Sequence, residues 1–186
     1  MCCILYIPAG VETPTINTLE AVYMFNSHGI GFADSDGNNF KTLSFRSFTK
    51  AIQKRRKEAA CIIHFRLATH GSISTKNCHP FYDKDNDVWF AHNGVLPIES
   101  HDDMTDSEIF FREGFIPALN DSNYNDPVLW KYVEKERFSS RFIFMHGNDI
   151  KMLGRWHKID GVYFSNMNWT GCGCNFGMSR GGILKF

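Results

Sequence analysis

The sequence lacks net charge, long apolar runs and an N-terminal targeting signal. Its 186 residues contain 20 Lys and Arg against 20 Asp and Glu, so no overall field attracts a nucleic acid or an anionic membrane. The one basic run, Lys54 to Lys57, has no interleaved aromatic residue of the kind that nucleic-acid binding uses. No apolar stretch approaches the roughly 20 residues of a membrane span. We therefore expect a cytoplasmic protein that binds neither nucleic acid nor membrane.

Cysteine is present, but not in the pattern of a disulfide framework or a metal site. In a cytosolic chain, the 6 cysteines do not indicate disulfide pairing. Cys172 and Cys174 have no second Cys or His pair at ligand spacing, which a structural zinc site requires. We expect no metal and no cofactor. Only Cys2 stands out, because it directly follows Met1.

Linkers, internal repeats and low-complexity tracts are also missing, so we expect one domain over residues 1–186. Short strands outnumber helices and come mostly as hairpins, which is typical of an α+β domain whose helices cover antiparallel sheet. The strongest strand patterns are at Cys2–Ile7, Ala60–Phe65 and Val88–His92. After the strand Ala60–Phe65 we expect a loop that runs to about Lys84. We also expect an irregular cap over residues 167–186.

Four helices are indicated by apolar periodicity and capping residues. They are expected over residues 16–26, from an N-cap at Ser47 to Lys57, from Thr105 or Asp106 towards Ala118, and onward from Pro127.

The first segment with chemical promise is Met1-Cys2. Methionine is generally removed before a small residue, which would leave Cys2 with a free α-amine beside its own thiol. An amine with a pKa of about 7.7–8 is suited to take the thiol proton near neutral pH. Nucleophile and base would then occupy one residue. Chance is the alternative, since many proteins have Cys at this position.

The second segment is His64-Phe65-Arg66-Leu67-Ala68-Thr69-His70-Gly71, at the end of a buried-type strand. An arginine there needs an anionic partner, and its planar fork matches a carboxylate in two-point contact. A nearby hydroxyl and imidazole would fix that carboxylate or hold the loop. The alternative is an internal ion pair with one of the protein's own carboxylates.

The third segment is Phe90-Ala91-His92-Asn93-Gly94. Here a strand end brings together the side-chain amide of Asn93 and the backbone N–H of Gly94. Two converging donors form an oxyanion hole, in which each is worth about 3 kcal/mol of transition-state stabilisation. Asn-Gly is also a common tight-turn dipeptide, so a plain turn is the alternative.

Together these segments resemble the class II glutamine amidotransferase domain of the N-terminal nucleophile hydrolases. That domain also forms the glutaminase half of glucosamine-phosphate synthase and of amidophosphoribosyltransferase. Further similar motifs follow in the family's order: Asn26-x-His28-Gly29-x-Gly31, Thr105-Asp106-Ser107-Glu108 and Gly161-Val162-Tyr163-Phe164-Ser165-Asn166. The resemblance spans nearly the whole chain. It implies a four-layer αββα sandwich, with two stacked, mainly antiparallel sheets and helices outside.

The resemblance also implies a mechanism and a set of roles. Mature Cys2, freed of Met1, attacks the amide carbon of a glutamine side chain, while Asn93 and Gly94 stabilise the oxyanion. Arg66 binds the substrate α-carboxylate, with Thr69 and His70 lining that pocket, and Asp106 binds the α-ammonium group. Ammonia leaves, and water or an acceptor resolves the thioester. The resemblance thus implies a glutamine amidotransferase or glutaminase, a transferase or hydrolase that needs no metal.

Two departures from the family bear on this expectation. Cys3 stands where the family usually has Gly, which puts bulk beside the nucleophile, and Leu67 stands where sugar-phosphate synthases have Trp. With about 20 residues after the last motif, we expect either a separate ammonia-accepting synthase subunit or a free-standing amidohydrolase acting on glutamine or a γ-glutamyl compound. The remaining alternatives are hydrolysis of another acyl amide, and a catalytically silent scaffold of the same fold.

Overall fold

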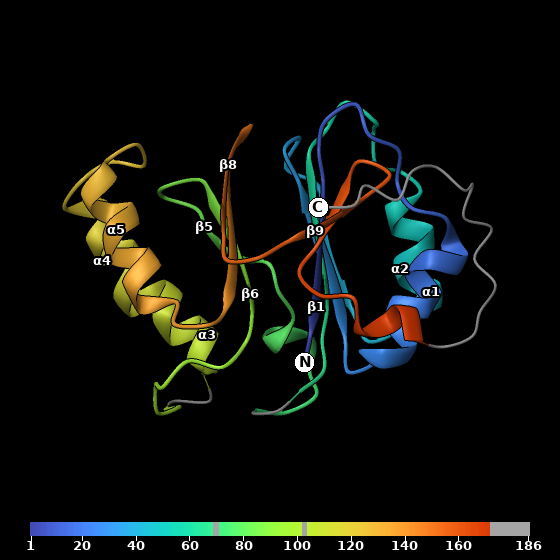
Figure 1. Cartoon of the computed structure of the whole chain (residues 1–186), viewed down its shortest axis with the longest axis horizontal. Helices are drawn as coiled ribbons and strands as arrows, with labels where there is room; N and C mark the ends of the chain where they lie inside the picture. The colour runs from blue at the N-terminus through green and yellow to red at the C-terminus, as the bar shows by residue number, and fades with distance from the viewer. Residues whose placement is uncertain (69–70, 102–103, 172–186) are drawn as a thin grey trace, which may run out of the picture.

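Two β-sheets lie face to face, with helices on both outer sides (Figure 1). The structure is a computed structural model that describes residues 1–68, 71–101 and 104–171. Every strand pair in either sheet is antiparallel. The α+β class and the four-layer αββα sandwich are therefore confirmed. Of the cap expected over residues 167–186, residues 172–186 lie outside the described part of the chain.

The larger sheet has six strands in the order β3-β2-β4-β1-β10-β9. Their bounds are β1 Cys3–Ile7, β2 Ile30–Asp34, β3 Asn39–Thr42, β4 Cys61–Phe65, β9 His157–Ile159 and β10 Val162–Phe164. In the central pair, Cys3 lies opposite Phe65. Because the strands run in opposite directions, this register brings the residue before β1, Cys2, next to the residue after β4, Arg66.

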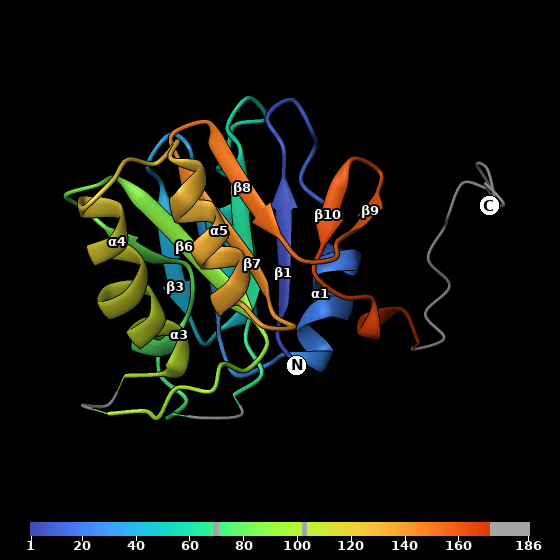
Figure 2. The ribbon, with the colours of Figure 1, turned by 60° about the vertical axis from the view of Figure 1, so that its left-hand side comes forward.

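The smaller sheet has four strands in chain order, visible beside β1 in Figure 2. Their bounds are β5 Phe81–Asp83, β6 Val88–Asn93, β7 Arg141–His146 and β8 Asp149–Leu153. The chain does not turn from β6 directly into its neighbour β7, because residues 94–140 and their helices intervene. Asn93 and Gly94 therefore do not form the tight turn of a hairpin, and that alternative for the third segment is wrong.

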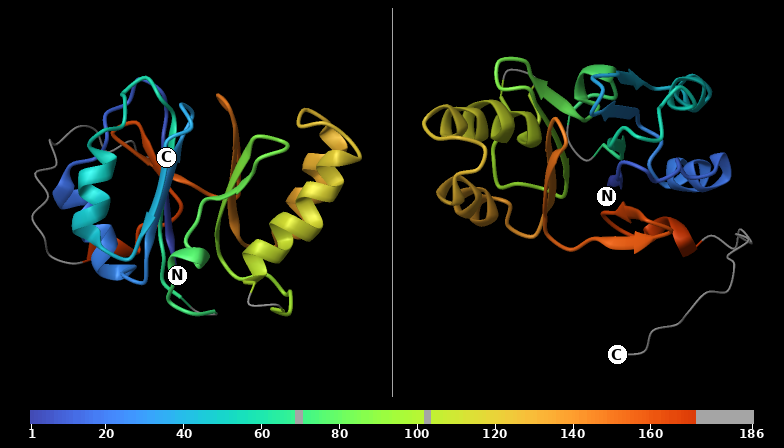
Figure 3. Two further views of the ribbon diagram at one scale, coloured as in Figure 1. Left: turned by 180° about the vertical axis from the view of Figure 1, so that it is seen from behind. Right: turned by 90° about the horizontal axis from the view of Figure 1, so that it is seen from above.

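Helices cover the outer face of each sheet, as both views in Figure 3 show. Helices α1 Ile16–Phe25 and α2 Phe45–Ile52 cover the larger sheet; α3 Asp106–Ile109, a π-helical segment Phe110–Phe115, α4 Ile116–Asn120 and α5 Pro127–Glu136 cover the smaller one. Short 3₁₀ turns occupy Thr75–Asn77 and Asn168–Gly171. Among the described residues, we find no helix with the length and apolarity to span a bilayer.

Three apolar layers hold these elements together. The two outer layers, between helices and sheets, are rich in phenylalanine, which accounts for much of the high aromatic content. The middle layer between the sheets is mainly aliphatic and contains Ile4, Ile62 and Ile143 among its wholly buried members. Beyond one end of this middle layer, the side chains between the sheets become polar, and this is where the N-terminus lies (Figure 1).

Several expected boundaries differ from the structure. Helix α2 begins after Ser44, whose hydroxyl accepts the Ser47 N–H at 3.3 Å, so Ser47 lies inside the first turn and is not the cap. The helix ends at Ile52, and the basic run follows it. The two three-residue strands β5 and β9 were not expected, because their sequences are too short to show an alternating pattern. By contrast, Thr105 caps α3 and Pro127 begins α5, as predicted.

Replacing Gly31 with alanine should destabilise the protein. A Cβ atom there would lie 2.0 Å from the backbone oxygen of His79, so strand β2 or the chain before β5 must shift. We expect Gly31→Ala to lower the free energy of unfolding by about 1–3 kcal/mol, measured by urea titration. As control, Gly114→Ala meets only the tip of Tyr132 at 3.2 Å and should be neutral or stabilising. An unchanged urea midpoint for Gly31→Ala would contradict the packing described.

Candidate active site

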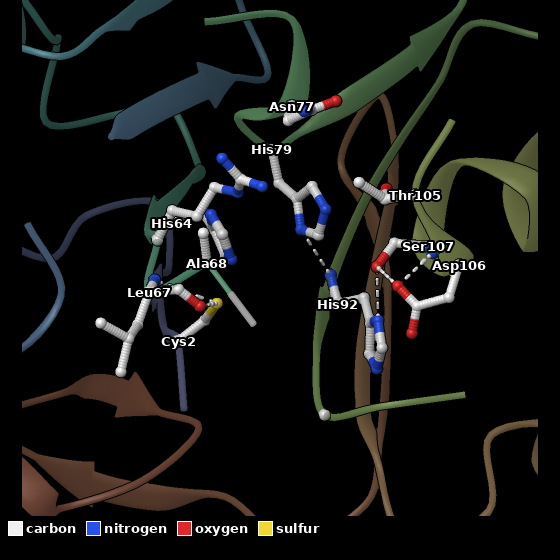
Figure 4. A pocket seen from close by; sticks show the side chains of 12 residues that line it. Cys2, His64, Leu67, Ala68, Asn77, His79, His92, Thr105, Asp106 and Ser107 are labelled. Atoms are coloured by element: carbon white, nitrogen blue, oxygen red, sulfur yellow. Dashed lines mark hydrogen bonds between the residues drawn. The ribbon is translucent and has the colours of Figure 1, made fainter. Parts of the chain in front are cut away.

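A single pocket brings together most of the residues singled out in the sequence (Figure 4). It lies between the two sheets and is lined by residues that include Cys2, Arg66, His79, His92, Gly94 and Asp106. The pocket has a volume of about 40 Å³, room for a few water molecules. A larger ligand must therefore also occupy the open side of the pocket or move its walls.

Cys2 lies at the entrance to β1, with its thiol against the chain that leaves β4. The Leu67 backbone N–H points at the Cys2 sulfur over 3.3 Å, and the carbonyl of Cys2 accepts a hydrogen bond from the Asn166 side chain at 2.6 Å. Burial raises the pKa of the Cys2 thiol, although the Leu67 amide and the positive charges of the N-terminus and Arg66 oppose this. At neutral pH the thiol thus needs a base to become a nucleophile.

The chain after β4 is held by backbone hydrogen bonds to the loop before β2. The Arg66 N–H donates to the carbonyl of Gly29 at 2.8 Å, and the Ala68 N–H donates to the ring of His28 at 3.0 Å. Arg66 is only 4% exposed, and its guanidinium donates to the Ser72 carbonyl at 2.8 Å. This fixes a cation in the wall of the pocket.

Asp106 provides a carboxylate on another wall, from the start of α3. One of its oxygens accepts the Leu96 N–H and the other the Ser107 N–H, each at 2.8 Å. The pocket therefore combines a thiol, a cation and an anion. Thr69 and His70, predicted to line it, lie outside the described residues.

The two predicted oxyanion donors are consecutive at the end of β6, but they differ in position. Gly94 lines the pocket, and a Cβ atom there would lie 2.1 Å from the Ser140 hydroxyl oxygen, so only glycine fits. Asn93 is 1% exposed and is not among the residues that line the pocket. Its side-chain NH₂ donates to the Ser165 hydroxyl at 2.8 Å.

Cys3 does not enter the pocket, so the expectation of added bulk beside the nucleophile is wrong. Successive side chains of a strand point to opposite faces. Cys3 therefore points away from Cys2, into the wholly buried core beneath the helices of the larger sheet. Leu67, the other departure, does line the pocket.

The pocket wall also contains a cluster of three buried histidines, His64, His79 and His92, for which the sequence indicated no role. The ring centroids of His64 and His79 lie 4.2 Å apart, and the backbone N–H of His92 donates to the ring Nδ1 of His79 at 3.2 Å. Burial lowers the pKa of His64 to about 3 and of His92 to about 4, and lowers that of His79 well below its usual value. All three are therefore neutral at pH 7. His64 and His92 lie in segments that the sequence singles out, but nothing in the local sequence around His79 indicates that it lies beside them.

No metal-binding group was found in the described part of the chain, where His, Cys, Asp and Glu side chains nowhere gather in threes suited to a metal ion.

Comparisons with known proteins point in one direction. A family model described as "Glutamine amidotransferases class-II" matches residues 38–114. Glutamine–fructose-6-phosphate aminotransferase [isomerizing] of Methanococcus maripaludis is 48% identical over 33 residues, which are 18% of this chain and 6% of that protein. Glutamine phosphoribosylpyrophosphate amidotransferase from B. subtilis, in complex with ADP and GMP, has a similar structure, with a TM-score of 0.54 and 16% identity.

A second structure, described as the allosteric regulatory enzyme of purine biosynthesis, matches with a TM-score of 0.55 and 16% identity. Both matches cover 88% of this chain but 41% of the other chain. The chain thus spans well under half the length of these proteins. The likeness shows that the fold is similar to that of these two proteins. With the family model, it confirms the resemblance of this chain to class II glutamine amidotransferases.

The neutral histidines should make the protein sensitive to acid. In the unfolded chain histidine takes up a proton near pH 6.5, whereas these folded-state pKa values are depressed, so stability falls as pH drops below about 6.5. When the pH falls from 7 to 5.5, we expect the free energy of unfolding of His64→Phe to decrease by about 1 kcal/mol less than that of the wild type. Urea titrations at both pH values measure this. The half-exposed His157, changed to Gln, serves as control, and an unaltered pH dependence in His64→Phe would contradict the prediction.

Proposed function

We propose that the protein hydrolyses the side-chain amide of glutamine through a thioester on Cys2 and releases ammonia. The observation that carries this proposal is that Cys2, Arg66 and Asp106 line one pocket. A cation and an anion there match the α-carboxylate and α-ammonium groups of an amino acid. The thiol is then available for the far end of the same molecule. A plain acyl amide would use neither charge, so this arrangement favours glutamine or another γ-glutamyl compound.

The first step requires removal of Met1. While Met1 is attached, the Cys2 nitrogen is an amide and cannot act as a base. Met1 is 56% exposed, so a processing enzyme can reach it. The freed α-amine takes the thiol proton that burial otherwise retains, and the sulfur attacks the amide carbon of the substrate. We assign this proton transfer to Cys2 itself because the pocket histidines are buried and poorly basic.

The next steps need stabilisation of charge on the former carbonyl oxygen. We assign this to the backbone N–H of Gly94 and the side-chain amide of Asn93. Collapse of the tetrahedral intermediate returns the proton to the leaving nitrogen, which departs as ammonia and leaves a γ-glutamyl thioester. Water, deprotonated by the same amine, attacks the thioester and releases glutamate and the free thiol. Arg66 and Asp106 hold the two α-substituents throughout, with Thr69 and His70 assigned to the carboxylate side.

Ammonia released in this way can serve an acceptor. We propose a separate synthase subunit as that acceptor, and a single domain over residues 1–186 acting as the glutaminase. No cofactor takes part in this proposal, because the thiolate and the two donors supply the nucleophilic and electrophilic chemistry.

Changing Cys2 to alanine should abolish glutamine hydrolysis without unfolding the protein. We expect ammonia release to fall by at least about 1,000-fold, because the only proposed nucleophile is removed. Intact mass should also show that the wild-type chain lacks methionine and gains one adduct, mapped to Cys2, on incubation with a diazoketone analogue of glutamine. Cys78→Ala is the matched control, since Cys78 is a buried cysteine that does not line the pocket.

Each other outcome has a defined meaning. Near wild-type turnover in Cys2→Ala would overturn the mechanism. A processed N-terminus without an adduct would favour another amide as the substrate. Retained methionine would identify a precursor or a silent member of the fold.

Changing Asp106 to asparagine should weaken binding of the substrate α-ammonium group. We expect the KM for glutamine to rise by about 10- to 100-fold, from loss of a charge-assisted hydrogen bond. Turnover of a glutamine analogue without the α-amine should change much less. Glu99→Gln is the control, because it removes an exposed charge from the loop before α3. Equal effects on both substrates would remove Asp106 from the ammonium site.

A further inference from the structure

Ser165 connects the two strands that carry the proposed catalytic groups. It follows β10 and is wholly buried. Its hydroxyl oxygen accepts the Ile4 N–H of β1 and the Asn93 side-chain NH₂ at the end of β6, each at 2.8 Å. Its own N–H donates to the Ile4 carbonyl at 2.9 Å. The Ser165 side chain thus bridges the two sheets. One of its partners, Ile4, lies two residues after Cys2 in the sequence.

The hydrogen-bond capacity of a hydroxyl determines which end of the Asn93 amide faces Ser165. A hydroxyl accepts two hydrogen bonds and donates one. The Ile4 N–H can only donate, so it occupies one acceptor position. The second acceptor position takes the side-chain NH₂ of Asn93 at 2.8 Å, so the NH₂ end of the amide, and not its carbonyl end, faces Ser165.

This orientation matters because the two ends of the amide have opposite effects on an oxyanion. With one N–H bound to Ser165, the second N–H of Asn93 stays available to the developing charge. A flipped amide would instead turn its oxygen towards that charge and repel it. The Asn93 oxygen is buried and has no hydrogen-bond partner among the described residues, so no other bond holds the amide in place.

We propose that Ser165 is a positioning residue that sets the orientation of the Asn93 amide and fixes it to the nucleophile strand. The inference rests on the proposed function, in which Asn93 stabilises the oxyanion, and it makes the two catalytic groups share one anchor.

A double-mutant cycle on glutamine hydrolysis tests this proposal. We expect Ser165→Ala to lower kcat by about 10- to 100-fold with KM changed less than about threefold, because the oxyanion forms only in the transition state. Asn93→Ala should lower kcat by about 100- to 1,000-fold. Adding Ser165→Ala to Asn93→Ala should cost little more, since the residue that Ser165 orients is already absent.

Two further variants separate orientation from a general loss of packing. Ser165→Thr keeps the hydroxyl and should retain kcat within a few-fold of wild type. Ser122→Ala removes a half-buried hydroxyl just after α4, which donates to the Ala118 carbonyl at 2.7 Å and does not line the pocket, and it should leave kcat unchanged. Independent losses of Ser165 and Asn93 that multiply in the double variant would overturn the proposal. So would a loss that appears in KM alone.

A measurement without substrate distinguishes failure of this inference from failure of the proposed function. The side-chain ¹⁵N–¹H signals of Asn93 are identified by their disappearance in Asn93→Ala. In Ser165→Ala we expect this pair to shift and to exchange faster with solvent, whereas in Ser122→Ala it should not. If the wild-type protein fails to hydrolyse glutamine, the proposed function is overturned, but the Asn93 signals can still be compared between the variants. An unchanged Asn93 signal in Ser165→Ala overturns the inference.

Discussion

The pairing of β1 with β4 is the constraint on which the rest of the site depends. Cys3 lies opposite Phe65, so the thiol of Cys2 comes next to the chain that carries Arg66 and Leu67. Both strands are central in the larger sheet and almost wholly buried, so a slip of one residue would turn every core side chain to the wrong face. The packing on both faces of these strands therefore also specifies where Cys2, the proposed nucleophile, lies.

Around that register, the fold places groups of different polarity at one end of the middle layer. The neutral histidines occupy space between the sheets without adding charge, so Arg66 and Asp106 are the charged side chains among the pocket-lining residues that the structure describes. Burial also keeps the Cys2 thiol protonated until a base is available. The exclusion of water that raises the pKa of the Cys2 thiol would also strengthen any interaction of the site with a charged intermediate.

Much of this arrangement was predictable because its signals are local. Strand β4 is a continuous apolar run, Thr105 and Pro127 are strong helix-start residues, and the chemical motifs lie directly at strand ends. The start of α2 was missed because Ser44 and Ser47 are equally good caps in sequence, and packing decided between them. The expected effect of Cys3 on the pocket was wrong because the direction of its side chain depends on the strand pleat. The contact between Ser165 and Asn93 joins residues from different sheets, so no sequence pattern announces it.

The division of the site between two sheets makes the aliphatic layer between them part of its alignment. Cys2, the proposed nucleophile, precedes β1 of the six-stranded sheet, and Gly94, a proposed oxyanion donor, follows β6 of the four-stranded one. Ile62 and Ile143 pack in that layer, and neither is among the residues that line the pocket. Closely packed interiors transmit small displacements because they contain little free space. A conservative change of side-chain volume at such a position would shear one sheet against the other. It would alter the relative positions of Cys2 and Gly94 without touching either residue.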